Sequence, residues 1–171
     1  GSLLCNRFCA ILRGSAPSVH RVTAVSNLLV TGAAGFIGSN FVHYWHKRSP
    51  QDTIVVLDAL TYAGCKLSLD SYEGTDWYTF VKGSVCDQAL VDSLLRKHRI
   101  NIIVNFAAES HVDRSISTPD EFIDTNIVGT HVLLKAARKF WMDRGREEPH
   151  LFHHVSTDEV YGSLAESDAP F

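Results

Sequence analysis

Three equally spaced glycines are the clearest chemical signal in the sequence. Gly32, Gly35 and Gly38 follow a short apolar run, Asn27 to Thr31, and open a stretch with helical spacing from Phe36 to about His46. Between a strand and a helix, such glycines permit a tight turn, let the backbone approach a pyrophosphate and allow close helix–strand packing. The helix N-terminus then offers free N–H groups to phosphates. The pattern predicts a dinucleotide-binding turn.

A carboxylate follows the turn at the spacing that such sites use. Asp58 comes 20 residues after Gly38, at the end of a second apolar run, Thr53 to Leu57. A carboxylate there can accept hydrogen bonds from an adenosine ribose and would repel a 2′-phosphate. The sequence therefore predicts NAD as the cofactor in preference to NADP. The alternative is three turn glycines and an ordinary loop aspartate.

Two adjacent acids near the end of the chain are candidates for acid–base chemistry. Asp158 and Glu159 follow Thr157 and an apolar run from Leu151 to Ser156. Neighbouring carboxyl groups repel each other, so one can stay protonated near neutral pH while the other is ionised. The alternative is a solvated helix or loop entry, where Thr-Asp-Glu is common.

The elements that must position these residues alternate between strand and helix. Asp87 is a predicted helix N-cap, and Thr118 to Glu121 has the sequence of a capping box with Pro119 at the first helical position. Alternation predicts an α/β fold, a doubly wound, Rossmann-like parallel sheet with its site at the carboxyl ends of the strands. The predicted strands are 27–31, 53–57, 78–81, 100–106 and 151–156, and the predicted helices start at Phe36, after Asp87 and at Pro119, the last running to about Asp143.

Composition narrows the class of protein. The 171 residues are 45% hydrophobic with a formal net charge of −3, which argues against nucleic-acid binding, and no apolar run is long enough to span a membrane. Four scattered cysteines favour a reducing compartment, so we expect a cytoplasmic protein. Residues 1–26 hold three arginines and no acid. They are predicted to be an extension (a tag, leader or disordered segment), or else a mitochondrial transit peptide, ahead of a domain at 27–171. No metal site is expected, because Cys5 and Cys9 lack a second pair of ligands.

Four segments resemble the dTDP-glucose 4,6-dehydratases, a family of the extended short-chain dehydrogenase/reductase superfamily. They are TGAAGFIG from Thr31, DALTYAG from Asp58, AAESHVDRS from Ala107 and STDEVYG from Ser156. The resemblance implies that NAD oxidises C4 of a nucleotide sugar, that water then leaves across C5 and C6, and that the hydride returns to C6. It also implies a homodimer.

The same resemblance implies a set of site residues. Thr157 would hydrogen-bond near the C4 oxygen, Asp158 would be the acid toward the C6 hydroxyl, and Glu159 the base at C5. Cofactor contacts are implied at Gly32, Gly35, Phe36, Ile37, Gly38, Asp58, Thr61, Ser84, Val85, Phe106, Ala107, Ala108 and Thr125. Substrate contacts are implied at Glu109, Ser110, Asp113 and Thr157, although a surface ion pair between Asp113 and Arg114 is an alternative.

The sequence also departs from the family pattern. Ala59 replaces a usual Lys, and Ser84–Val85 replaces a usual Asp-Ile. The 171 residues contain no Tyr-x-x-x-Lys pair after the fifth predicted strand, so we expect an NAD-binding half with little or no turnover by itself. An exposed helix face with Val128, Val132 and Phe140 is expected to drive self-association. Two alternatives stay open: a UDP-glucose dehydratase of rhamnose synthesis, and a non-catalytic NAD-binding module.

Overall fold

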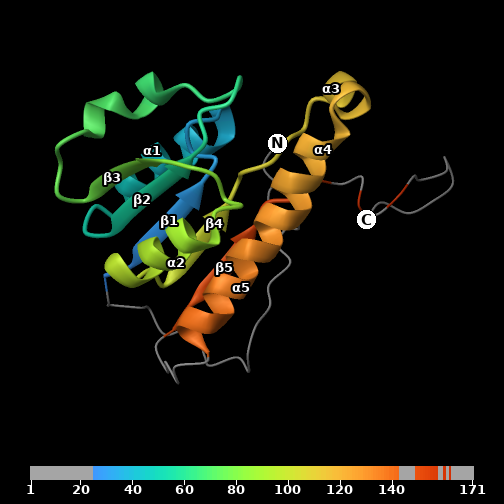
Figure 1. Ribbon diagram of the computed structural model, residues 1–171. Coiled ribbons are helices and arrows are strands. Elements are labelled where there is room, and N and C mark those ends of the chain that lie inside the picture. Colours follow the sequence, from blue (N-terminus) through green and yellow to red (C-terminus); the bar gives the residue numbers. More distant parts are fainter. Residues whose placement is uncertain (1–24, 143–148, 158–159, 161, 163–171) are drawn as a thin grey trace, which may run out of the picture.

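The computed structural model describes residues 25–142, 149–157, 160 and 162 of the chain. Its centre is a five-stranded sheet in the order β3-β2-β1-β4-β5, and every neighbouring pair is parallel (Figure 1). The strands are β1 (Asn27–Thr31), β2 (Thr53–Asp58), β3 (Tyr78–Lys82), β4 (Ile102–Asn105) and β5 (Leu151–His154). The predicted doubly wound α/β class is therefore confirmed. The chain reverses its direction of winding between β1 and β4, which is where open α/β sheets place their ligands.

Helices cover both faces of the sheet, as Figure 1 shows. They are α1 (Phe36–Arg48), η1 (Lys66–Tyr72), α2 (Gln88–Lys97), α3 (Val112–Ser117), α4 (Pro119–Phe122), η2 (Ile123–Gly129) and α5 (Thr130–Trp141). The Asp87 side chain accepts a hydrogen bond from the Leu90 N–H and so caps α2 as predicted. None of the described helices is long and apolar enough to cross a membrane.

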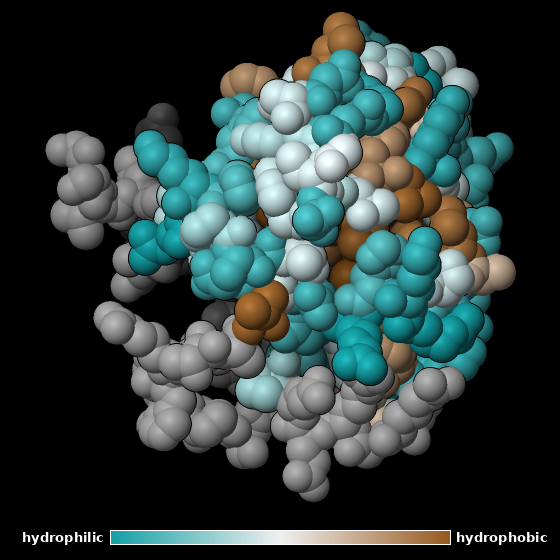
Figure 2. Space-filling model, turned by 90° about the vertical axis from the view of Figure 1, so that its left-hand side faces the viewer, coloured by the Kyte–Doolittle hydropathy of each residue, from teal (hydrophilic) through white to brown (hydrophobic). Residues whose placement is uncertain are grey.

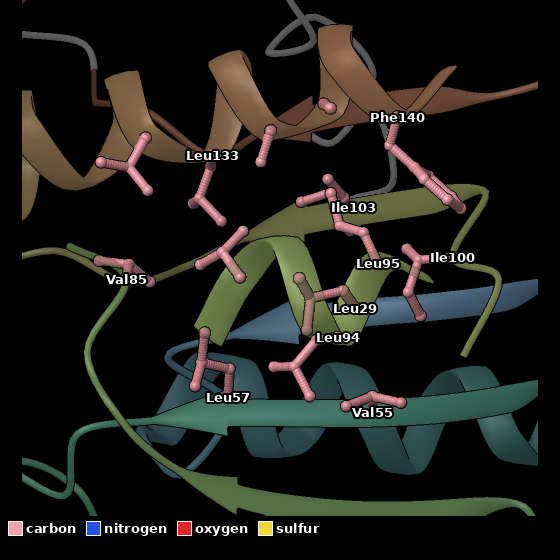
Figure 3. Close-up of a cluster of buried hydrophobic side chains, with 14 of the residues drawn as sticks. Leu29, Val55, Leu57, Val85, Leu94, Leu95, Ile100, Ile103, Leu133 and Phe140 are labelled. Atoms are coloured by element: carbon pink, nitrogen blue, oxygen red, sulfur yellow. The ribbon is translucent and has the colours of Figure 1, made fainter. Parts of the chain in front are cut away.

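The larger core lies between the sheet and the pair α2 and α5 (Figure 3). Leu94 and Leu95 of α2 face Leu133 and Phe140 of α5, and all four are at most 5% exposed. The Trp141 indole is also buried, and its Nε1–H donates to the Ile100 carbonyl over 2.8 Å. Packing of this kind fixes α5 against the sheet, which in turn fixes the segments that precede it.

A second, more aromatic core lies on the face covered by α1 and η1. It buries Val42 of α1 and Leu69 of η1 completely, together with the side chains of β1 and β2 that lie on this face of the sheet. The ring of Trp77 stacks on His46 with centroids 3.6 Å apart. Figure 2, which shows the molecule from the side of β3, has hydrophobic residues gathered in a band among hydrophilic ones.

The region from Thr118 to Trp141 differs from the prediction. The Thr118 side chain makes no capping bond, because its hydroxyl donates to the Arg114 carbonyl instead, and so the predicted capping box is wrong. The single predicted helix is also interrupted, since residues Ile123–Gly129 wind as a π-helix between α4 and α5.

The expected exposed face on this helix is wrong for two of its three residues. Val132 is 8% exposed and Phe140 5%, both packed in the α2–α5 core, whereas Val128 is 40% exposed. These two side chains are therefore not available to a second chain. Self-association stays a prediction, now without the argument from Val132 and Phe140.

Candidate cofactor-binding site

The glycine-rich turn packs directly against the backbone that leaves β4. Gly32 has a positive φ of 68°, and a Cβ there would lie 2.6 Å from the Ala107 nitrogen. A Cβ on Gly38 would lie 2.6 Å from the Ala33 Cα, so α1 and the turn touch through their backbones. Only glycine meets both requirements without displacing backbone.

Gly35 has a different role in the turn. Its φ of −74° and ψ of 166° suit any residue, and a Cβ there would have one close neighbour, the Gly32 oxygen at 3.2 Å. Phe36 and Ile37, which follow, are 84% and 64% exposed. The absence of a side chain at Gly35 therefore keeps open the space in front of the N-terminus of α1, where backbone N–H groups can face a phosphate.

Asp58 holds this turn in place. Its Oδ2 accepts from the Ala34 N–H and its Oδ1 from the Leu60 N–H, both over 2.8 Å. The Ala34 carbonyl in turn accepts from the Cys65 N–H. Asp58, the residue predicted to contact a ribose, is thus buried, at 8% exposure. It joins the turn after β1 to the loop after β2, which comprises residues 59–65.

A polar network lies beneath the turn, between β1, β4 and β5. The Thr31 hydroxyl donates to Asn105 Oδ1, and Asn105 Nδ2 donates to His154 Nδ1 over 3.1 Å. Partial burial, with a smaller effect of His153, lowers the pKa of His154. His154 is therefore neutral near pH 7 and serves as a structural acceptor.

A pocket of about 390 Å³ opens at the carboxyl ends of β2, β3 and β4. Its volume falls in the range of small-molecule sites. It brings together four predicted residues, Thr61, Ser84, Glu109 and Thr125, and five that were not predicted, namely Tyr62, Cys86, Arg114, Glu121 and Asp124.

Glu109 is the most buried acid of this pocket, at 8% exposure. Its backbone N–H and carbonyl are both paired with the Asn126 side-chain amide, each over 2.8 Å. Its Oε2, by contrast, has no hydrogen-bond partner among the described residues. A buried oxygen without a partner is costly, so a ligand that supplies a donor here would be favoured.

Arg114 pairs with Glu121, its Nη2 lying 2.5 Å from Oε2, and the alternative of an ion pair with Asp113 is not what the structure shows. The spacing did not identify Glu121 as the partner, because the helix is interrupted between α3 and α4 at Thr118. In one continuous helix, residues seven apart lie on one face but about two turns apart, so the direct contact between Arg114 and Glu121 depends on this interruption.

The other predicted residues surround the pocket or lie elsewhere on the same sheet edge. Phe106 and Ala107 follow β4 and are half-buried, with Ala107 against the glycine turn, and Ala108 and Ser110 are exposed. The Val85 side chain is 7% exposed within the core, so only its backbone is available to a ligand. Asp113 is exposed on α3, and Thr157 is exposed after β5. Asp158 and Glu159 lie outside the described residues.

No group of three metal-ligating side chains occurs among the residues that the structure describes. The cluster that does occur is a carboxylate-rich pocket with one arginine, Arg114. Such a lining suits hydroxyl and amine donors.

Several curated proteins match most of this chain. A dTDP-glucose 4,6-dehydratase of Xanthomonas campestris is 53% identical over 141 residues, which are 81% of this chain and 40% of that protein. A dTDP-glucose 4,6-dehydratase of Escherichia coli is 46% identical over 143 residues, 82% of this chain and 39% of that protein. The chain thus spans about 40% of the length of these relatives.

Solved structures agree with the sequence matches. The dTDP-glucose 4,6-dehydratase of Bacillus anthracis, in complex with NAD, superposes with a TM-score of 0.70 at 40% identity, over 86% of this chain and 42% of that one. The enzyme DesIV of Streptomyces venezuelae, a dTDP-glucose 4,6-dehydratase with NAD and TYD bound, superposes with a TM-score of 0.61 at 44% identity, over 67% and 36% of the two chains. The family model described as GDP-mannose 4,6 dehydratase matches residues 29–170, and the chain therefore belongs to that family.

Proposed function

We propose that this chain is the NAD-binding part of a nucleotide-sugar 4,6-dehydratase acting on dTDP-glucose, with dTDP-4-keto-6-deoxyglucose as product. The observation that carries the proposal is the turn at Gly32 to Gly38, which Asp58 fixes while Gly35 leaves the helix N-terminus open. The names of the relatives and the NAD in the Bacillus anthracis complex support it. The proposal assigns residues 27–171 to the cofactor domain and residues 1–26 to a separate extension.

The residues present fit NAD. Backbone N–H groups at the start of α1 would hold the pyrophosphate, and Asp58 and Thr61 lie where the adenosine ribose would bind. Ser84 lines the pocket after β3, and Ser84 and the backbone of the adjacent Val85 are proposed contacts on the adenine side. Phe106, Ala107 and Ala108 follow β4, and Thr125 of η2 lines the pocket; all four are proposed cofactor contacts.

Thr157, Asp158 and Glu159 are proposed to act on the sugar. The chemistry that NAD would supply when bound is to accept a hydride from C4 of the sugar and later to return it to C6. Thr157 follows β5 at the carboxyl edge of the sheet, where its hydroxyl can donate toward the C4 oxygen. Asp158 would protonate the leaving C6 hydroxyl, and Glu159 would remove the C5 proton. Glu109, Ser110 and Asp113 are proposed substrate contacts on the β4 side.

The substrate is proposed to be the dTDP sugar because the matched relatives carry that name and because Glu109–Ser110 stands in the segment they resemble. A UDP-glucose dehydratase is the second candidate. The third candidate is a non-catalytic NAD-binding module, which would convert neither sugar nucleotide even when joined to the part of the relatives that this chain does not span.

The test is NAD⁺ binding by titration calorimetry on the full chain and on two glycine variants. Gly35→Ala is expected to fold normally but to weaken NAD⁺ binding at least about tenfold, because its methyl group enters the phosphate space. Gly32→Ala is expected to destabilise the fold, because its Cβ meets backbone and its φ is positive.

The expected pattern includes tighter binding of NAD⁺ than of NADP⁺, since Asp58 would face the 2′-phosphate. Absence of NAD⁺ binding by the wild-type chain, or full binding by a folded Gly35→Ala variant, would overturn the cofactor proposal. Turnover assays with dTDP-glucose and UDP-glucose then separate the two dehydratase candidates when they are made on a protein that also contains the part of the relatives that this chain does not span.

A further inference from the structure

Three side chains from separate elements meet beside the pocket. Tyr62 belongs to the loop after β2, Arg114 to α3 and Glu121 to α4. The Arg114 guanidinium lies 4.2 Å from the centroid of the Tyr62 ring, and it donates to Glu121 Oε2 over 2.5 Å. All three line the pocket. A planar guanidinium that stacks on a ring while it pairs with a carboxylate is held in one orientation.

The electrostatics of the group favour the same arrangement. Loss of hydration, together with the nearby Glu109 carboxylate, raises the pKa of the Tyr62 hydroxyl, and so this hydroxyl stays protonated. The hydrogen bond from Arg114 to Glu121 raises the pKa of the guanidinium. A neutral ring beneath a permanent cation is the pairing that cation–π attraction requires.

Because Tyr62 lies in the middle of the loop after β2, its contact with Arg114 connects this loop to α3. One end of its loop is tied to the glycine turn directly, because the Cys65 N–H donates to the Ala34 carbonyl. The other end is tied through Asp58, whose carboxylate accepts from both the Leu60 and the Ala34 N–H. The stack on Arg114 joins the middle of the loop to α3, and both residues line the pocket together with Ser84. A ligand between these walls leaves most easily when that contact opens.

On the basis of the proposed function, we propose that Tyr62, Arg114 and Glu121 form a latch. This latch closes the pocket beside the adenosine half of bound NAD and slows the release of NAD. The adenosine half is assigned because Thr61 and Ser84, which line the pocket, follow β2 and β3, the strands on the Asp58 side of the glycine turn. The three residues position the pocket wall and take no part in the chemistry.

The first experiment measures release of NADH by stopped-flow fluorescence, with excess NAD⁺ as the displacing ligand. Tyr62→Leu and Arg114→Met each remove the stack and are expected to speed release at least about fivefold. Tyr62→Phe keeps the ring and is the matched control, with release within about twofold of wild type. Tyr44→Leu controls for loss of another exposed tyrosine, since Tyr44 is 58% exposed on α1.

The double variant Tyr62→Leu/Arg114→Met tests whether the two residues act as one unit. Its release is expected to be no faster than that of the faster single variant. Effects of the two substitutions that multiply, or single variants within twofold of wild type, would overturn the latch. A fivefold acceleration in Tyr62→Phe would overturn the role of the stack.

A second readout needs no cofactor. Hydrogen exchange of the Leu60, Gly64 and Cys65 amides is expected to speed up in Arg114→Met, because the loop loses its tether to α3. Unchanged exchange would overturn the latch whatever the release rates. Failure of the wild-type chain to bind NADH at all would instead overturn the proposed function, and the exchange result would show whether the tether itself exists.

Discussion

The carboxylate of Asp58 accepts a hydrogen bond from the Ala34 backbone N–H over 2.8 Å, so the end of β2 fixes the turn that follows β1. Its other oxygen accepts from the Leu60 N–H, and the carboxylate therefore orders two loops. Asp58 thus has a structural role that is separate from its proposed contact with a ribose. Substitution there is expected to affect folding as well as NAD binding.

We predict that Asp58→Asn lowers the free energy of unfolding by about 1–3 kcal/mol. The amide has one acceptor oxygen for two backbone donors, and its NH₂ group then faces an N–H. Urea denaturation without cofactor measures the effect. Asp76→Asn, at an exposed position, is the control and is expected to change stability by less than about 0.5 kcal/mol. Equal stability of the two variants would contradict the structural role.

Two tyrosines of the second core are expected to respond in opposite directions to loss of their hydroxyl groups. Tyr78 is 6% exposed, its Oη has no partner among the described residues, and burial raises its pKa to about 12. The Tyr72 hydroxyl lies 2.6 Å from His43 Nδ1. We predict that Tyr78→Phe raises the free energy of unfolding by about 1 kcal/mol and that Tyr72→Phe lowers it by about 0.5–1.5 kcal/mol. Denaturation of both variants checks this, and a loss of stability in Tyr78→Phe would show that its hydroxyl is satisfied.

Adjacent leucines on α5 give a direct test of which face is buried. Leu133 is fully buried in the α2–α5 core, whereas Leu134 is 39% exposed. Leu133→Ala is predicted to cost about 2–5 kcal/mol, the range for a large-to-small core substitution. Leu134→Ala is predicted to cost less than about 1 kcal/mol. Thermal and urea denaturation measure both, and similar losses at the two positions would mean that α5 is rotated from the orientation described.

The sheet could be predicted from the sequence because its strands are buried on both faces. Such strands are continuous apolar runs, and β1 begins and ends where the run from Asn27 to Thr31 does. The glycine turn could be predicted for a related reason, since its local geometry depends on residue type and spacing alone.

The helix after Thr118 could not be predicted in the same way. Its π-helical segment depends on tertiary contacts: the Asn126 amide pairs with both backbone groups of Glu109, and Gly129 lies against Val85. Which face of α5 is buried likewise depends on its packing against α2, and the sequence of α5 alone does not identify that partner. Tyr62 and Glu121 were missed because this wall of the pocket is assembled from the loop after β2 and two short helices, α3 and α4, and no local period relates residues of such separate segments.

Acid sensitivity is predicted at the ion cluster between α2 and α5. Partial burial acts to raise the pKa of Asp92, but hydrogen bonds from Lys139 (2.8 Å) and Gln88 (2.9 Å) outweigh it, and its pKa lies below the usual value. The unfolded chain therefore binds more protons in this range, and the stabilisation from Asp92 is complete above the unfolded pKa of about 3.9. It is lost as the pH falls through the folded pKa.

Lys139→Met removes the main partner of Asp92 and is predicted to lower the free energy of unfolding by about 0.5–1 kcal/mol at pH 7. The difference from wild type is predicted to stay constant between pH 7 and 5 and to shrink only below about pH 4, as the pH falls toward and through the folded pKa of Asp92, because a protonated Asp92 no longer attracts Lys139. Urea denaturation at pH 7, 5, 4 and 3 measures it. Lys135→Met, at an exposed position on the same helix, is the control and should show no pH-dependent difference. A difference between Lys139→Met and wild type that stays constant down to pH 3 would place the effect in packing of the Lys139 side chain, because only the charge interaction titrates with Asp92.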